Sequence, residues 1–297
     1  MTIFSRAAAL ALAGLALALP GCSKSDDAPP VATVTLTPNK RDLPVGSPIE
    51  FTYRFEVAPG AKISGDYRVF MHAIRDDGSM IWNDDHDLPA EYATSAWKPG
   101  QVIEYKRTRF VPASSYLGTA TLTMGLYKDE DRLTLAGPDP GDAGQRGKEY
   151  TVGTLNLRPR SESITLVKLD GWHPAEVSPE DATVDWQWTR KTATMSLRNP
   201  KRDLMLWMEF DARPDLFPDN PQQVTIYAGG TAVGTVKADR PGRMLERMPI
   251  PASLLSGDMA EIRIEVDRTF TPARLAGGSG DPRELGIRVF NVYVEAR

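Results

Sequence analysis

The sequence predicts an all-β protein made of two antiparallel β-sandwich domains. Apolar and polar residues alternate with a period of two in several segments, and clusters of glycine and proline separate those segments. No apolar pattern with the period of a helix runs for more than about two turns. Strict alternation places one side of a strand on a core and the other in water, which is typical of antiparallel sheets. Many short strands punctuated by turn residues favour sandwiches.

Five segments carry this alternation most clearly. In each of them every second residue is apolar, and we expect those residues to be buried. The segments are residues 49–57, 120–126, 193–197, 204–210 and 260–266. Gly229 and Gly230 predict a hairpin turn between strands at 224–227 and 232–236, and residues 251–256 predict one short turn.

The final strand contains a break in its phase. Ile287 and Val289 share one face, but the next apolar pair is Val292 and Val294. One extra residue restores the phase, which is what a β-bulge does. We therefore predict a bulge near Phe290.

The best boundary between the two domains is at Pro159-Arg160-Ser161, where one strand-like segment ends and another begins at Ile164. We expect one domain at residues 31–158 and another at residues 161–297. Residues 22–30 are polar and end in two prolines, which predicts a tether rather than a packed element. Residues 1–21 form a separate leader.

The leader has a secretory pattern. Arg6 precedes an apolar run over residues 7–19, and small residues then lead to Cys22, the only cysteine of the chain. The run is shorter than the roughly 20 residues of a membrane-spanning helix. The segment resembles the signal peptide and lipobox of bacterial lipoproteins. That resemblance implies cleavage before Cys22, lipidation of Cys22 including a palmitate-type acyl chain, and anchoring in the cell envelope. An ordinary cleaved signal with an incidental cysteine is the alternative.

Ser23 follows Cys22, and no aspartate stands directly after the cysteine. By the same resemblance this favours the outer membrane over retention in the inner membrane, without fixing which side of the outer membrane. The formal net charge is −4, with acidic and basic residues interspersed. Nucleic-acid binding is not expected, because a phosphate backbone requires a basic stripe. The oligomeric state is left open.

Residues 31–158 contain a series of short motifs. They are Tyr67-Arg68-Val69-Phe70-Met71-His72, Asp77-Gly78, Asp84-Asp85-His86, Trp97-Lys98-Pro99-Gly100, Val111-Pro112, Thr123-Met124-Gly125-Leu126-Tyr127 and Arg132-Leu133. Together these motifs resemble an Ig-like accessory module of bacterial envelope proteins. Such modules are often found beside surface-polysaccharide machinery.

Residues 161–297 contain a second series of motifs. They are Gly171-Trp172-His173-Pro174-Ala175-Glu176, Trp186-Gln187-Trp188-Thr189, Phe270-Thr271-Pro272 and Asp281-Pro282-Arg283-Glu284-Leu285-Gly286-Ile287. Together these motifs resemble a jelly-roll module of the galactose-binding-like type, which is also common in glycan-assembly proteins. Gln187 stands where an arginine is frequent in such modules, so a ligand contact by that arginine is not expected here.

Within the second domain, aromatic, acidic and basic residues suggest a shallow glycan site. Sugars bind through aromatic faces and through paired hydrogen bonds from acids and arginines. The candidates are Trp172, His173, Glu176, Trp186, Trp188, Asp281 and Arg283. The structural alternative is that Trp186 and Trp188 belong to a core, and that Asp281 and Arg283 pair with Glu176 and Trp186 to lock the ends of the sheet.

The first domain contains His72, Asp84 and His86, which are weak candidates for metal ligands. A zinc site usually needs three or four converging ligands, and the chain has only three histidines, none in a metal-binding spacing. No metal and no cofactor is expected.

The sequence contains no nucleophile elbow of the Gly-x-Ser-x-Gly type and no His-Glu-x-x-His motif. We therefore expect no enzymatic activity. The leading hypothesis is a non-catalytic accessory or binding module of the envelope that engages glycan or its assembly machinery. One alternative is a protein–protein scaffold of an envelope complex. Another is a hydrolase, which requires convergence of His72, Asp84 and His86, or of His173 and Glu176.

Overall fold

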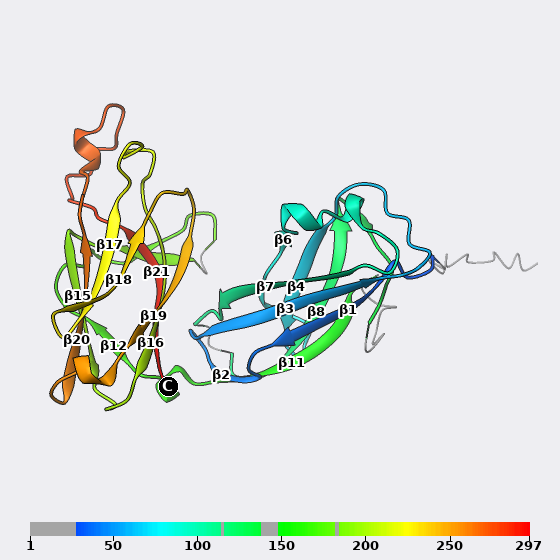
Figure 1. Ribbon diagram of the computed structural model, residues 1–297, viewed down its shortest axis with the longest axis horizontal. Helices are drawn as coiled ribbons and strands as arrows, with labels where there is room; N and C mark the ends of the chain where they lie inside the picture. The colour runs from blue at the N-terminus through cyan, green and yellow to red at the C-terminus, as the bar shows by residue number, and fades with distance from the viewer. Residues whose placement is uncertain (1–27, 114–115, 138–147, 182–183) are drawn as a thin grey trace, which may run out of the picture.

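A computed structural model describes residues 28–113, 116–137, 148–181 and 184–297. The expected signal peptide, Cys22 and most of the expected tether lie outside the described residues. Among the described residues, no helix is long and apolar enough to cross a membrane. The chain forms two β-sandwiches, joined end to end, with only short 3-10 turns between strands (Figure 1). The predicted fold class is confirmed.

The N-terminal sandwich packs a four-stranded sheet against a seven-stranded one. The smaller sheet has the order β10-β1-β3-β7, and the larger has β2-β11-β8-β4-β5, with β6 paired to β4 and β9 to β8. The strands are β1 (Ala32–Pro38), β2 (Asp42–Pro44), β3 (Pro48–Val57), β4 (Arg68–Ile74), β5 (Met80–Asn83), β6 (His86–Asp87), β7 (Val102–Phe110), β8 (Gly118–Lys128), β9 (Asp131–Arg132), β10 (Leu135–Ala136) and β11 (Tyr150–Arg158). The 3-10 turns η1 (Ala90–Tyr92) and η2 (Thr94–Ala96) lie between β6 and β7.

The core of this sandwich follows the alternation in the sequence. In β3 the five alternate residues from Ile49 to Val57 are buried, and in β8 so are the four from Ala120 to Leu126. Two pairings differ from the expected antiparallel pattern, because β1 pairs with β10 and β2 with β11 in parallel. The two short strands β10 and β2 lie at the edges of their sheets. β10 pairs with β1 in the smaller sheet, and β2 pairs with β11 in the larger one.

The C-terminal sandwich packs two five-stranded antiparallel sheets, of order β12-β15-β20-β17-β18 and β13-β14-β21-β16-β19. The chain passes repeatedly from one sheet to the other, as it does in jelly rolls. The strands are β12 (Leu166–Lys168), β13 (Glu176–Val177), β14 (Asp185–Trp188), β15 (Thr192–Arg198), β16 (Leu204–Asp211), β17 (Gln223–Ala228), β18 (Thr231–Lys237), β19 (Met244–Ile250), β20 (Met259–Val266) and β21 (Arg288–Ala296). The 3-10 turns are η4 (Ala252–Leu254) and η5 (Pro272–Arg274).

Three local predictions are confirmed in this sandwich. The alternate apolar residues of β15, β16 and β20 are buried in its core. The register between β16 and β21 shifts where Glu209 opposes Asn291 and Phe210 opposes Val289, so Phe290 is the extra residue of a bulge. β17 and β18 form a hairpin whose turn residues Gly229 and Gly230 have φ of 55° and 80°, values that glycine adopts at little cost.

A short segment joins the two sandwiches. β11 ends at Arg158, η3 spans Arg160–Glu162, and β12 begins at Leu166. An ion pair of 3.3 Å between Lys40 and Glu295 links the sandwiches as well. This junction lies at the end of the N-terminal sandwich where β1 finishes and β3 starts, whereas Val31 lies at the opposite end, where its N–H donates to the Thr134 carbonyl (Figure 1).

Candidate functional site

The structure brings together the acidic and basic residues predicted for a site in the C-terminal sandwich. Arg283 donates to both carboxylate oxygens of Asp281, at 2.7–3.0 Å, and forms an ion pair with Glu176 at 2.7 Å. The indole nitrogen of Trp186 donates to the other oxygen of Glu176 at 3.2 Å. Hydrogen bonds from Arg283 hold the pKa of Asp281 below its usual range. These are the pairings that the structural alternative predicts. In them the polar groups of the predicted site bind one another.

His173 and Trp172 are also held by protein atoms. The Nε2 of buried His173 lies 2.7 Å from the Glu284 carbonyl, and the indole of Trp172 donates to the Thr194 carbonyl at 2.8 Å. Gln187, at the position where an arginine is frequent, donates to the His173 carbonyl at 2.9 Å. His173 and Glu176 thus have separate partners and do not converge as the hydrolase hypothesis requires.

Trp186 and Trp188 lie on the outer face of their sheet, so the structural alternative that placed them in a core does not hold. Trp188 pairs with Arg288 across β14 and β21, and Arg288 alternates with the core residues Ile287 and Val289. The two indoles are only partly buried. Sequence spacing placed both on one side of a strand but could not say which side.

The Arg288 guanidinium is surrounded by aromatic rings. Its central carbon lies 4.9 Å from the ring centre of Trp186, 5.7 Å from that of Trp188 and 5.1 Å from that of Phe290. Asp211, buried beneath, accepts hydrogen bonds from Arg288 on both oxygens. Cations over ring faces are attracted by the ring quadrupole, so this arrangement fixes both the arginine and the rings.

A second arginine continues this arrangement. The Arg243 guanidinium carbon lies 3.9 Å from the ring centre of Phe290. Its Nη1 is 3.8 Å from Glu209, and Glu209 accepts a shorter hydrogen bond of 2.7 Å from Asn291. We call the set Trp186, Trp188, Arg243, Arg288 and Phe290 the aromatic–arginine face. No sequence motif marks Arg243, Arg288 or Phe290 as site residues, although the bulge predicted near Phe290 lies at this place.

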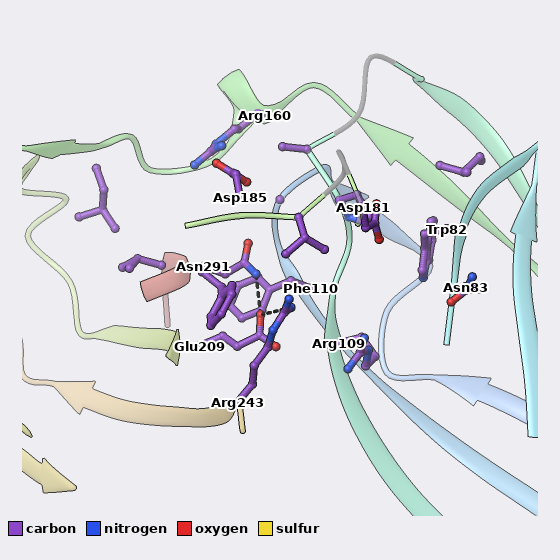
Figure 2. Close-up of a pocket in the computed structure, with 18 of the residues that line it drawn as sticks. Trp82, Asn83, Arg109, Phe110, Arg160, Asp181, Asp185, Glu209, Arg243 and Asn291 are labelled. Atoms are coloured by element: carbon purple, nitrogen blue, oxygen red, sulfur yellow. Dashed lines mark hydrogen bonds and ion pairs between the residues drawn. The ribbon is translucent and has the colours of Figure 1, made fainter. Parts of the chain in front are cut away.

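Two members of the aromatic–arginine face, Arg243 and Phe290, line a cleft of about 580 Å³ between the two sandwiches, and Figure 2 shows Arg243 in it. Phe290, Asn291, Glu209 and Arg243 line it from the C-terminal sandwich. From the N-terminal sandwich it is lined, among others, by Trp82, Arg109 and Phe110. Saccharides are bound by such mixtures of rings and hydrogen-bonding groups.

In the N-terminal sandwich, Asp84 is a structural ion rather than a metal ligand. It is 2 % exposed and accepts hydrogen bonds from Arg107 on both oxygens, at 2.8 and 2.9 Å, and from the hydroxyl of Tyr53 at 2.9 Å. Arg109 approaches it at 3.1 Å. Burial alone raises the pKa of Asp84, but the Arg107 hydrogen bonds and the two guanidinium charges outweigh burial and lower it.

The three predicted metal candidates do not converge. His86 faces the core beside Asp84, with its Nε2 2.8 Å from the Tyr105 hydroxyl, and burial lowers its pKa. His72 lies on the opposite face of the sheet, 3.4 Å from Asp85 and 3.8 Å from Glu149. No group of three metal-binding side chains occurs among the described residues. The convergence of His72, Asp84 and His86 that a hydrolase requires is likewise not present.

Two carboxylates, those of Asp85 and Glu149, stabilise the charged form of the His72 imidazole. Hydrogen bonding to Asp85 and Glu149 raises the pKa of His72 to about 9, against the opposing effect of burial. The imidazole is therefore protonated at neutral pH. This pairing ties β4 to the segment before β11.

No family model matches the chain, and no curated protein matches it. Among solved structures, the chain is similar to the CBM51-2 and INT domains of ZmpB from Clostridium perfringens, at 11% identity and a TM-score of 0.21, over 59% of this chain and 38% of that one. The CBM51-2 domain in complex with GlcNAc, together with the INT domains of the same protein, matches at 10% identity and a TM-score of 0.22, over 87% of this chain and 41% of that one. A collagen adhesin from S. aureus matches at 9% identity and a TM-score of 0.19, over 90% of this chain and 96% of that one. The chain thus spans about two fifths of the length of the two Clostridium structures. Likenesses this distant carry no argument about function.

Proposed function

We propose that this protein is a non-catalytic, membrane-anchored binding module of the bacterial envelope that engages glycan. The observation that carries the proposal is the aromatic–arginine face. Partly exposed rings and guanidinium groups stand side by side there, at the edge of the cleft. Sugar rings offer C–H surfaces that pack on aromatic faces and hydroxyls that pair with charged groups.

The carboxylates around this surface favour binding over catalysis. Asp211, Glu176 and Asp281 are each paired with an arginine at 2.5–2.7 Å. The hydrogen bonds from Arg283 hold the pKa of Asp281 below its usual range, so the ionised form of Asp281 is favoured. Such a group serves poorly as the general acid that glycoside hydrolysis needs. The same pairs fix the surface in one shape, which reduces the entropy lost on binding.

The membrane anchor in this proposal is Cys22, at the end of the lipobox-like leader. The leader's pattern and the short polar segment that follows it support the anchor. Two or more acyl chains give stable attachment to a bilayer. Mass spectrometry of the protein extracted from bacterial membranes tests this part. A mature N-terminus at Cys22 carrying diacylglycerol and an amide-linked acyl chain is expected, and an unmodified Cys22 contradicts it.

The glycan part is tested on an array of bacterial surface saccharides with the full chain in detergent. We expect binding that Trp188→Ala and Phe290→Ala reduce. Tyr227→Ala is the matched control, because Tyr227 also stacks on an arginine, Arg263, at 3.9 Å, but lies in the other sheet of the same sandwich. Absence of saccharide binding, or equal loss in all three variants, contradicts the proposal.

A further inference from the structure

The cleft between the sandwiches contains two arginines that face it from opposite sides. Arg109 comes from β7 of the N-terminal sandwich, and Arg243 comes from the segment just before β19 of the C-terminal one (Figure 2). Their side chains are 39% and 38% exposed. Neither sandwich alone provides both.

The partner of Arg109 in the fold, Asp84, has enough hydrogen-bond donors without it. Asp84 already accepts two hydrogen bonds from Arg107 and one from Tyr53, at 2.8–2.9 Å. Arg109 adds only an Nε contact at 3.1 Å to the same carboxylate, and it forms no other ion pair with the described residues. Since a guanidinium has five N–H donors, most of its hydrogen-bonding capacity is left for a ligand.

Arg243 is held in place by a ring rather than by a close ion pair. It stacks on Phe290, and its carboxylate neighbour Glu209 lies 3.8 Å away with a shorter hydrogen bond to Asn291. Stacking leaves the edge of a guanidinium, where its donors lie, free to pair with an anion. In the described part of the chain Arg243 forms no other ion pair.

The remaining charged groups of the cleft leave its lining slightly positive. Arg160 and Lys168 line it together with Asp181 and Asp185. With Arg109, Arg243 and Glu209 counted, the lining holds four basic and three acidic side chains. Of the acids, Glu209 is only 12% exposed and lies against Asn291, so the accessible charge beside Arg243 is positive.

We propose that the cleft binds an acidic oligosaccharide, whose carboxylates pair with Arg109 and Arg243. The proposal rests on the proposed function, because it names the chemistry of the glycan. Guanidinium–carboxylate pairs are often bidentate, and they are about twice as strong as neutral hydrogen bonds. Phe290, which supports Arg243, also offers a ring edge to the sugar.

The test uses saccharides in matched pairs that differ only in oxidation at C6. They are galactotriose with trigalacturonate, cellotetraose with its tetraglucuronate, and mannotriose with trimannuronate, each measured by calorimetry with the full chain in detergent. We expect a uronate to bind at least about tenfold more tightly than its neutral partner, because a charged hydrogen bond adds about 1.4 kcal/mol or more. Arg109→Gln and Arg243→Gln should each weaken uronate binding about tenfold, and each should weaken the binding of the neutral partner clearly less.

Arg247→Gln is the matched control. Arg247 lies in β19 near Arg243, and its guanidinium carbon is 5.9 Å from the ring centre of Trp207, but it does not line the cleft. Thermal unfolding verifies that each variant is folded, which Arg109→Gln should be, because Arg107 still holds Asp84. Equal binding of the two members of every pair, or uronate binding that both cleft variants retain, overturns this inference and leaves the glycan-binding function standing. If the pairs and the surface-saccharide array all show no binding, the proposed function itself fails.

Discussion

Arg107 and Asp84 form a two-point pair inside the N-terminal sandwich, with both carboxylate oxygens accepting from the same guanidinium at 2.8 and 2.9 Å. The carboxylate belongs to the segment between β5 and β6, and the arginine belongs to β7 in the opposite sheet. The pair therefore joins the two layers. Removing one member of such a buried pair leaves the other charge uncompensated.

Asp84→Asn is expected to destabilise the N-terminal sandwich by about 1.5–3 kcal/mol, because the buried side chain no longer accepts charge-assisted hydrogen bonds from Arg107 on both oxygens. Urea denaturation followed by tryptophan fluorescence measures the change. Asp87→Asn is the control, since Asp87 pairs with Arg68 on the surface at 2.8 Å and is 80% exposed; it should have little effect. Equal effects of the two substitutions would show that Asp84 has no special structural role.

The same carboxylate predicts a loss of stability in acid. The pKa of Asp84 is lower in the folded state than its ordinary value, so the folded state binds the proton less well than the unfolded state does. The stabilisation is present above the unfolded pKa of about 3.9 and is lost as the pH falls through the folded pKa. Denaturant midpoints between pH 6 and pH 2 should fall less steeply in Asp84→Asn than in the wild type. Parallel curves would contradict the prediction.

His72 predicts the opposite dependence on the alkaline side. Its folded pKa of about 9 exceeds the ordinary histidine pKa of 6.5, because it hydrogen-bonds to Asp85 and Glu149. The stabilisation is fully present below pH 6.5 and is lost as the pH rises through about 9. Unfolding midpoints should therefore decline over this window in the wild type and stay flat in His72→Gln. NMR titration of the His72 ring gives an independent check. A titration midpoint near the ordinary histidine pKa of 6.5 would contradict the raised pKa of His72.

Gly171 tests whether the backbone beside the predicted site is tightly packed. Its φ is 84°, and a Cβ there would lie 1.9 Å from the Thr192 carbonyl oxygen. Gly242 has the same φ of 84° with nothing within 4 Å, so it isolates the cost of the positive φ, about 1–2 kcal/mol. Gly171→Ala should lower the melting temperature clearly more than Gly242→Ala. Similar shifts would mean that conformation alone explains the glycine.

The sequence predicted what depends on the period of a strand. Alternation identified the buried faces of β3, β8, β15, β16 and β20, and it located the bulge at Phe290 because an extra residue interrupts the count. It could not predict the short parallel strands β2 and β10, since two or three residues carry no period and pair with whichever edge the fold presents.

The candidate site likewise depends on contacts between distant segments, which no local pattern predicts. Trp186 and Trp188 were recognised by their residue type, but Phe290 comes beside Trp186, at a ring separation of 6.1 Å, only because β14 pairs with β21 across about 100 residues of chain. Arg243 reaches this cluster from the segment just before a third strand, β19. The cleft depends on how two sandwiches meet at residues 159–165, and no local pattern encodes that meeting.

Val31 and the junction lie at opposite ends of the N-terminal sandwich. β3 is 10 residues long, which corresponds to about 33 Å of rigid sheet. In the proposed lipoprotein, this sandwich works as a spacer that holds the aromatic–arginine face away from the lipid headgroups. The cleft can then meet long polymers or tall neighbouring assemblies at a set height, and shortening or duplicating the first sandwich should move that height without altering the binding surface.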